Sequence, residues 1–135
     1  MRSLRLAVLA NWGLGAEMVR SLLEMDQVVI KFLVTRFDDE SADPWQNLVR
    51  DLGLEHGIEI FDERETGFEA LRSLLLEQEV DIALCHAYMR KLPAEVLSAP
   101  SLACANIHAS LLPRYRGAKP HLATLASGDK QSGLT

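Results

Sequence analysis

Two residues near the end of an apolar segment, Asn106 and His108, have the types and the spacing that acyl transfer requires. Side chains alternate along a β-strand, so residues two positions apart project from the same face. An amide can donate a hydrogen bond to a developing oxyanion, and an imidazole can move a proton near neutral pH. On spacing alone, an ordinary polar end of a strand is the alternative.

Two other segments follow predicted strands and could line a ligand. Residues 11–15 (NWGLG) lack the full glycine spacing of a dinucleotide fingerprint, and Thr35-Arg36 stands where an acidic residue would bind ribose. We therefore expect a plain strand-to-helix turn there, with Asn11 as a candidate lining residue. Residues 86–93 (HAYMRKLP) could wrap a flat ligand or form an ordinary connection.

The elements that must position these residues alternate along the chain. Short runs rich in apolar and β-branched residues predict strands at 4–10, 28–35, 58–61, 80–86 and 102–107. Apolar residues at helical spacing predict helices around 18–23, 45–56, 68–75, 93–97 and 121–126. This alternation predicts an α/β fold with a doubly wound, mainly parallel, Rossmann-like sheet, in a single domain of residues 1–135.

Composition narrows the function classes. The formal net charge of −5 makes nucleic acid a poor default partner, although a local basic patch would still be compatible with tRNA. Cys85 and Cys104 lie in apolar runs, so we expect buried thiols and no metal site, because no ligand spacing is complete. The chain start fits a strand better than a signal peptide, and we expect a cytoplasmic protein without a membrane span.

The segment Asn106–Gly117 (NIHASLLPRYRG) closely resembles the signature of the formyltransferase family that uses 10-formyltetrahydrofolate. That family includes enzymes that act on methionyl-tRNA, on glycinamide ribonucleotide and on sugar nucleotides. The resemblance continues upstream through 80–82, 87–88 and 92–97, and downstream through 127–135. Residues 80–135 match in sequence, whereas the residues before them match mainly in topology.

The resemblance implies a role for each matched residue. Asn106 would stabilise the oxygen of the tetrahedral intermediate, and His108 would assist charge stabilisation and proton transfer. The formyl donor, 10-formyltetrahydrofolate, would be held by the loop residues Tyr88, Met89, Arg90 and Leu92 and by the wall residues Ser110, Leu111, Leu112 and Pro113. The amine substrate would meet Asn11, Arg114, Arg116 and His121, with a structural role as the alternative for either arginine.

The match is incomplete in one respect. The family's third catalytic residue is an aspartate on a loop that would follow Thr135, and Asp129 lies instead in a Gly-Asp turn that the family shares. We therefore expect a sheet that is incomplete at its carboxyl-terminal side and little formyl transfer by these 135 residues alone. An uncovered strand edge favours association, so a homo-oligomer is one expected arrangement.

The substrate branch is predicted from two short segments. Residues 114–117 (RYRG) are more similar to the tRNA and sugar branches than to the purine branch. Residues 36–44 are short and acidic where the tRNA enzymes usually carry a long basic loop, which favours a small primary amine such as an amino-sugar nucleotide. Methionyl-tRNA formyl transfer is the alternative. A non-catalytic folate- or nucleotide-binding module and a dinucleotide-dependent oxidoreductase are rivals from other classes.

Overall fold

The computed structural model describes residues 2–135, which form two compact units. The first unit ends at Ala105, and the second runs from Asn106 to Thr135. Within residues 2–135, no helix is long and apolar enough to cross a membrane. The prediction that residues 1–135 form a single domain stays a prediction.

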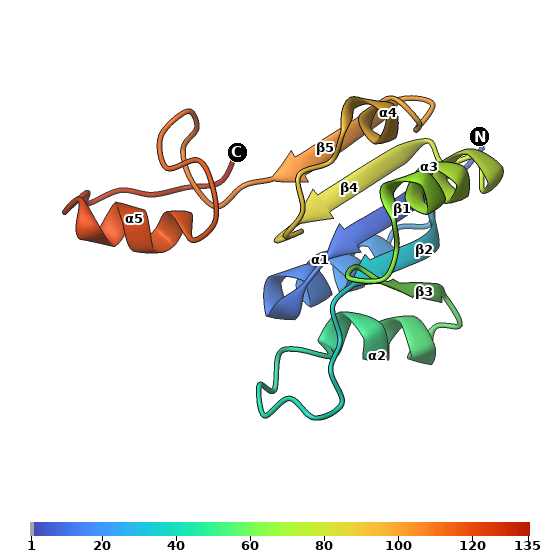
Figure 1. Cartoon of the computed structure of the whole chain (residues 1–135), viewed down its shortest axis with the longest axis horizontal. Coiled ribbons are helices and arrows are strands. Elements are labelled where there is room, and N and C mark those ends of the chain that lie inside the picture. The colour runs from blue at the N-terminus through green and yellow to red at the C-terminus, as the bar shows by residue number, and fades with distance from the viewer. Residues whose placement is uncertain (1) are drawn as a thin grey trace. The chain divides into compact units, whose positions relative to one another are not determined.

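A parallel sheet with strand order β3-β2-β1-β4-β5 is the centre of the first unit (Figure 1). The strands are β1 (Leu4–Ala10), β2 (Val28–Thr35), β3 (Glu59–Asp62), β4 (Ile82–His86) and β5 (Ala103–Ile107). From β1 the chain moves outwards to β2 and β3, and it then returns to add β4 and β5 on the other side. This confirms the predicted doubly wound sheet and places its switch point between β1 and β4.

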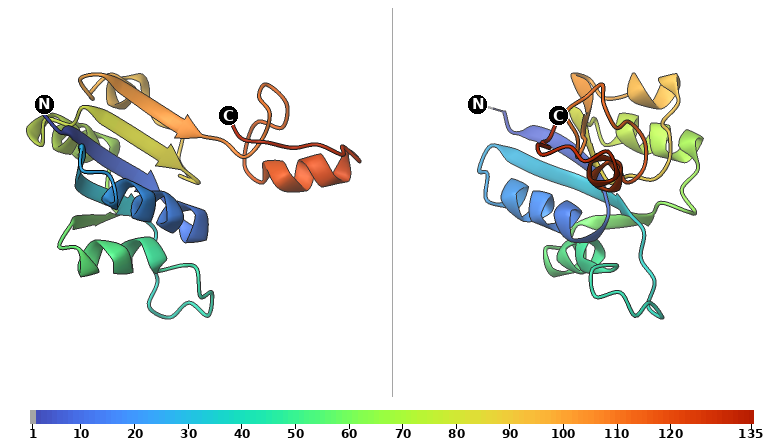
Figure 2. Two further views of the ribbon diagram at one scale, coloured as in Figure 1. Left: turned by 180° about the vertical axis from the view of Figure 1, so that it is seen from behind. Right: turned by 90° about the vertical axis from the view of Figure 1, so that its left-hand side faces the viewer.

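Helices cover both faces of this sheet, as Figure 2 shows. They are α1 (Trp12–Leu23), α2 (Leu48–Glu55), α3 (Phe68–Glu77) and α4 (Ala94–Leu97). Side chains alternate along β1, so Ala7 and Leu9 pack in the core that holds Leu71 of α3, and Val8 packs in the core that holds Val19 of α1. Burial on both faces explains why the central strands are apolar throughout.

The predicted elements are all present, and some of them have shifted ends. The helix predicted from residue 45 begins at Leu48, because Asp43 accepts the backbone N–H of Trp45 at 2.9 Å and that of Gln46 at 3.2 Å, which forms a turn. The strand predicted from Val80 begins at Ile82, because the Val80 N–H instead donates to a carbonyl of α3 at 2.9 Å.

Polar contacts fasten the amino-terminal edge of the sheet. Asp81, just before β4, accepts the backbone N–H of Arg5 at 2.9 Å, the Arg5 guanidinium, and the Ser101 hydroxyl at 2.9 Å. These contacts lower the pKa of Asp81, and the Arg5 backbone N–H is the largest cause. Asp81 therefore joins the starts of β1 and β4 to the segment that leads into β5.

The second unit contains α5 (Pro120–Ala126) and a short backbone pairing. The His108 N–H donates to the Thr135 carbonyl at 2.7 Å, and the Thr135 N–H donates back to the His108 carbonyl at 2.9 Å. The Thr135 hydroxyl also donates to the Ser110 carbonyl at 2.7 Å. These bonds hold the segment after β5 against residues far along the chain.

Candidate functional site

Four strands of the first unit end in polar residues at the carboxyl edge of the sheet. Asn11 follows β1, Thr35 ends β2, Glu63 follows β3 and His86 ends β4, and all four are buried. Ligands of open α/β sheets bind outside this edge, near the switch point. The polar edge is therefore the part of the first unit to examine for a binding site.

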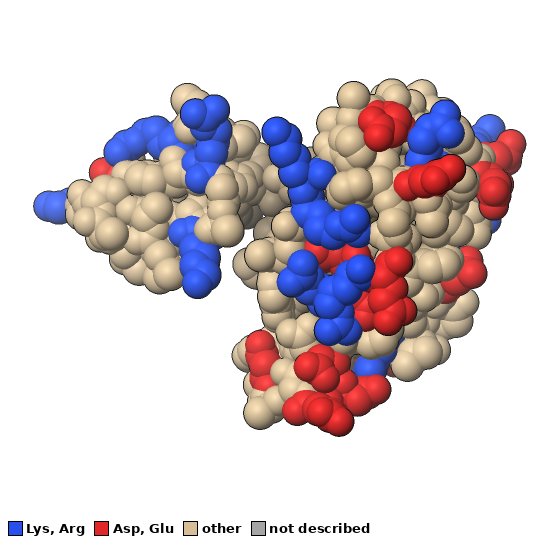
Figure 3. Space-filling view, viewed as in Figure 1, with Lys and Arg blue, Asp and Glu red and all other residues tan. Residues whose placement is uncertain are grey.

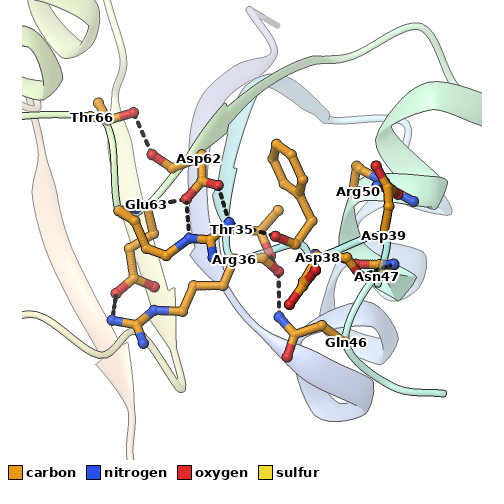
Figure 4. Close-up of polar contacts among 12 residues, drawn as sticks. Thr35, Arg36, Asp38, Asp39, Gln46, Asn47, Arg50, Asp62, Glu63 and Thr66 are labelled. Atoms are coloured by element: carbon orange, nitrogen blue, oxygen red, sulfur yellow. Dashed lines mark hydrogen bonds and ion pairs between the residues drawn. The ribbon is translucent and has the colours of Figure 1, made fainter. Parts of the chain in front are cut away.

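Glu63 is the centre of this edge, and its side chain is 0 % exposed. Its carboxylate accepts the Asn11 side-chain amide at 2.7 Å, the Arg36 guanidinium at 3.2 Å and the backbone N–H of Met89 at 3.2 Å. Figure 4 shows Arg36 directed toward the Glu63 carboxylate. Because a buried carboxylate is costly unless donors surround it, these contacts fix the geometry of three segments at once.

Asn11 is also enclosed by protein groups. Its side-chain oxygen accepts the Arg36 backbone N–H at 2.6 Å and the Thr35 hydroxyl at 3.2 Å. Its side-chain nitrogen donates to Glu63 and, at 2.9 Å, to the Ala87 carbonyl. The amide thus links the end of β1 to the ends of β2, β3 and β4. Its predicted contact with substrate stays a prediction.

The loop of residues 87–92, which the sequence assigns to the formyl donor, is partly anchored in the core. Tyr88 and Leu92 pack against the core cluster between the sheet and α3, whereas Met89 is 45 % exposed. The Tyr88 hydroxyl is buried without a hydrogen-bond partner of ordinary geometry. Burial, together with the negative charge of Glu63, raises the pKa of Tyr88 to about 12, so this hydroxyl is protonated at neutral pH.

Arg90 fastens the same loop to the segment after β3. One guanidinium nitrogen donates to the Glu63 carbonyl at 2.8 Å and to the Thr66 carbonyl at 2.6 Å. The guanidinium carbon also lies 4.1 Å from the centre of the Phe68 ring. The structure therefore shows Arg90 bracing the loop, and a contact of Arg90 with the formyl donor stays a prediction.

Charges of both signs lie on the surface around this edge (Figure 3). The acidic loop of residues 36–44 is partly neutralised by arginines: Arg50 pairs with Asp39 and lies 5.4 Å from the centre of the Phe37 ring, and Arg64 donates to the Phe37 carbonyl at 2.7 Å. Arg50 therefore offsets part of the negative charge of this loop, which keeps an excess of acidic side chains.

In the second unit, His108 follows the end of β5 and Asn106 is an exposed residue of that strand. The Nε2 atom of His108 lies 3.0 Å from the Tyr115 carbonyl oxygen. A carbonyl can only accept, so Nε2 carries the proton and the Nδ1 atom of the neutral ring keeps a lone pair. The ring is thus oriented as a base by a backbone group.

A second polar cluster shapes the segment that follows. Ser110 is buried, and its hydroxyl donates to the Arg114 carbonyl at 2.8 Å. Asp129 accepts the Tyr115 hydroxyl at 2.6 Å and pairs with the Arg114 guanidinium at 2.8 Å. The Tyr115 hydrogen bond is the largest cause of a lowered pKa of Asp129, and the Arg114 charge adds to it. Asp129 thus has a structural partner set, in keeping with its expected non-catalytic role.

The remaining predicted residues lie on the surface of the second unit. Leu111, Leu112, Pro113, Arg116 and His121 are exposed. An open groove of about 340 Å³ is lined by His121, Thr124, Leu125, Asp129, Lys130, Gln131 and Ser132. His121 therefore borders a groove, whereas the guanidinium of Arg114 is engaged with Asp129. The roles of these residues in binding stay predictions.

Sequence reasoning missed Glu63 and Tyr115. Glu63 lies in the charged run 62–65 (DERE), which resembles an ordinary solvated turn, so no local signal marks it as buried. Tyr115 lies inside the recognised signature, but its contacts with His108 and Asp129 depend on a backbone φ of +56° that composition does not reveal. Among residues 2–135, no group of three or more His, Cys, Asp or Glu side chains is arranged to hold a metal ion.

Solved structures share this fold. The chain superposes on phosphoribosylglycinamide formyltransferase from Anaplasma phagocytophilum with a TM-score of 0.78 and 24% identity, over 99% of this chain and 63% of that one. It also superposes on a formyltetrahydrofolate deformylase from Pseudomonas syringae with a TM-score of 0.77 and 21% identity, over 99% and 45% of the two chains. At these identities the likeness shows the fold alone.

Similar sequences extend the comparison. A methionyl-tRNA formyltransferase of Methylobacillus flagellatus is 44% identical over 87 residues, which are 64% of this chain and 28% of that protein. One of Ectopseudomonas mendocina is 36% identical over 137 aligned residues, which are 98% of this chain and 43% of that protein. The chain thus spans less than half the length of these relatives. The family model described as formyl transferase matches residues 20–135. The predicted resemblance is therefore confirmed, and the chain belongs to the formyl transferase family.

Proposed function

We propose that the protein transfers the formyl group of 10-formyltetrahydrofolate to the primary amine of methionyl-tRNA. The observation that carries the proposal is the Asn106–His108 pair at the end of β5, inside the region 20–135 that the family model matches. Similarity to proteins named methionyl-tRNA formyltransferase, in one case along 98% of the chain, supports the tRNA acceptor. Cytoplasmic location and a homo-oligomeric state stay predictions.

The relatives support methionyl-tRNA over the small amine that the sequence favours. That preference depended on the acidity of residues 36–44, which would repel phosphate. In the folded unit, Arg50 pairs with Asp39 and offsets part of this negative charge. The similarity to proteins named methionyl-tRNA formyltransferase, rather than this pairing, favours a tRNA acceptor. An amino-sugar nucleotide is the comparison substrate in the test.

The proposed chemistry uses the two residues in complementary ways. The acceptor nitrogen attacks the formyl carbon, and the carbonyl oxygen gains negative charge, which the Asn106 amide stabilises by donating a hydrogen bond. The Nδ1 lone pair of His108 takes a proton from the attacking amine and returns it to the folate nitrogen as the old C–N bond breaks. The products are formylated amine and tetrahydrofolate.

The proposal also assigns the binding residues. Tyr88, Met89, Arg90 and Leu92 hold the pterin of the donor, and Ser110, Leu111, Leu112 and Pro113 form the wall between donor and acceptor. We assign Asn11, Arg114, Arg116 and His121 to the acceptor. Support comes from the family match and from the loop of residues 87–92, whose exposed Met89 lies between anchored neighbours.

Substitution of the catalytic pair tests the proposal. Asn106→Ala and His108→Ala should each lower kcat/KM for formyl transfer by about 100-fold or more, because each removes a group that acts in the transition state. The exposed His56 gives a matched control, and His56→Ala should leave the rate unchanged. Rates are measured as tetrahydrofolate release with methionyl-tRNA as acceptor. Wild-type rates in both catalytic variants would refute the assigned roles.

A further inference from the structure

We propose that Glu63 is a positioning residue that holds the loop of residues 87–92 in the conformation that binds the formyl donor. The inference rests on the proposed function, because that function assigns the loop to the donor. Nothing in the local sequence marks Glu63, which lies in the charged turn after β3. The contacts of Glu63 with this loop all lie within the first unit.

The Glu63 side chain reaches the middle of the loop directly. It accepts the backbone N–H of Met89 at 3.2 Å, although the side chain of Met89 is 45 % exposed. The backbone of the exposed Met89 is thus held by a side chain that is itself 0 % exposed. A charged acceptor makes this a stronger bond than a neutral one would be.

The same carboxylate controls the start of the loop through Asn11. The Ala87 backbone has φ of +54°, a left-handed conformation that a residue with a Cβ adopts at a cost. The Asn11 amide donates to the Ala87 carbonyl at 2.9 Å and to Glu63 at 2.7 Å. Glu63 therefore orients the amide that holds Ala87 in this conformation.

The backbone of Glu63 also holds Arg90, the loop residue that follows Met89. Its carbonyl accepts the Arg90 guanidinium at 2.8 Å, and the Thr66 carbonyl accepts the same nitrogen at 2.6 Å. Three loop residues, Ala87, Met89 and Arg90, are thus tied to Glu63, the first of them through Asn11. Removal of the Glu63 carboxylate should therefore free the first part of the loop, whereas Arg90 stays bound to the Glu63 backbone carbonyl.

The neighbouring Asp62 provides a matched control. It is the last residue of β3 and has a side chain that is 6% exposed, but its carboxylate pairs with Arg64 at 2.6 Å. Its pKa is lowered, chiefly by the Arg64 side-chain hydrogen bond. Asp62→Asn therefore removes a buried carboxylate charge at the same strand end, while the Glu63 carboxylate still accepts the Met89 N–H.

The test compares Glu63→Met, Glu63→Gln and Asp62→Asn with the wild-type protein. Glu63→Met keeps the length of the side chain without an acceptor, and Glu63→Gln keeps one carbonyl oxygen and serves if the Met variant does not fold. Amide hydrogen exchange of Met89 should be about tenfold faster in Glu63→Met than in the wild type. The dissociation constant for tetrahydrofolate and the KM for the formyl donor should rise by about tenfold, with kcat within about twofold.

The outcomes separate this inference from the proposed function. Unchanged Met89 exchange and folate affinity in a folded Glu63→Met variant would overturn the positioning role. A fall in kcat with an unchanged donor KM would overturn it too, since positioning of the donor loop acts on binding. If the wild-type protein does not bind tetrahydrofolate, the proposed function fails, while Met89 exchange still decides whether Glu63 positions the loop.

Discussion

At the scale of single residues, the candidate site depends on side chains whose orientation is set by backbone groups. The Tyr115 carbonyl holds the Nε2 atom of His108 at 3.0 Å, and the Met89 N–H donates to Glu63 at 3.2 Å. Fixed partners reduce the reorganisation needed when charge develops in a reaction. This is the physical reason to expect His108 to act at the reacting atoms and Glu63 to act on donor binding through the loop of residues 87–92.

A cysteine pair gives a prediction at the same scale. The hydrogen bond from Cys85 lowers the pKa of Cys104 to about 7, and the same bond raises the pKa of Cys85. The rate of Cys104 alkylation by iodoacetamide should therefore reach half its maximum near pH 7, below the usual value of about 8.5 for a free thiol. The reaction is followed by mass spectrometry across pH.

Removal of the Cys85 thiol, which donates the hydrogen bond to Cys104, provides the control. In Cys85→Ala the midpoint for Cys104 should rise by about one pH unit or more toward the value of a free thiol, because the thiolate loses its hydrogen bond. A wild-type midpoint that already lies near 8.5, or one that Cys85→Ala does not move, would contradict this assignment.

The proposed catalytic pair can be recognised in the sequence, whereas the burial of Glu63 cannot. Asn106 and His108 lie in a twelve-residue signature, and their two-residue spacing on a strand is itself informative. Glu63 is buried only because three donors from different strand ends converge on it. Such convergence is a property of the folded sheet, so no local pattern carries it.

At the scale of elements, two strand ends flank the switch point with unusual backbone conformations. Trp12, just after β1, has φ of +57°, and Ala87, just after β4, has φ of +54°. Both are non-glycine residues, and strain of this kind concentrates at functional sites. Two such residues thus lie at the carboxyl edge. Glu79, with φ of +50°, lies near the opposite edge, which Asp81 fastens.

Close packing of α2 on the sheet gives a prediction about stability. A Cβ atom at Gly53 would lie 2.8 Å from Ile60 and 2.9 Å from the fully buried Leu33. Gly53→Val should therefore lower the free energy of unfolding by about 1–3 kcal/mol, because the helix must move off the sheet. Urea denaturation measures the change. Leu54→Ala, at an exposed position of the same helix, should leave stability nearly unchanged, and equal stability of all three proteins would exclude the tight contact.

The sequence predicts elements best where packing and local preference agree. β1 and β2 have the predicted bounds because both are apolar strands buried by neighbours. The predicted start of α2 is three residues too early. The Asp43 side chain accepts the Trp45 backbone N–H, and the resulting turn competes with a first helical turn at this position. Helix and strand periodicity does not register such side-chain competition.

At the scale of the whole molecule, family membership bears on the reaction and the acceptor, and net charge bears on how a tRNA could bind. The match over residues 20–135 shows the family, and similarity to methionyl-tRNA formyltransferases supports the acceptor. A net charge of −5 argues for a local rather than a general surface for tRNA. The acceptor is therefore the part of the proposal that depends most on experiment.

The most direct test is a comparison of acceptors with the full-length protein. With 10-formyltetrahydrofolate as donor, formylation of methionyl-tRNA should exceed formylation of an amino-sugar nucleotide by about 100-fold or more in kcat/KM, and His108→Ala should abolish the difference. Efficient formylation of the amino-sugar nucleotide, with methionyl-tRNA left unmodified, would contradict the proposed acceptor. No formyl transfer to either amine would contradict the proposed reaction.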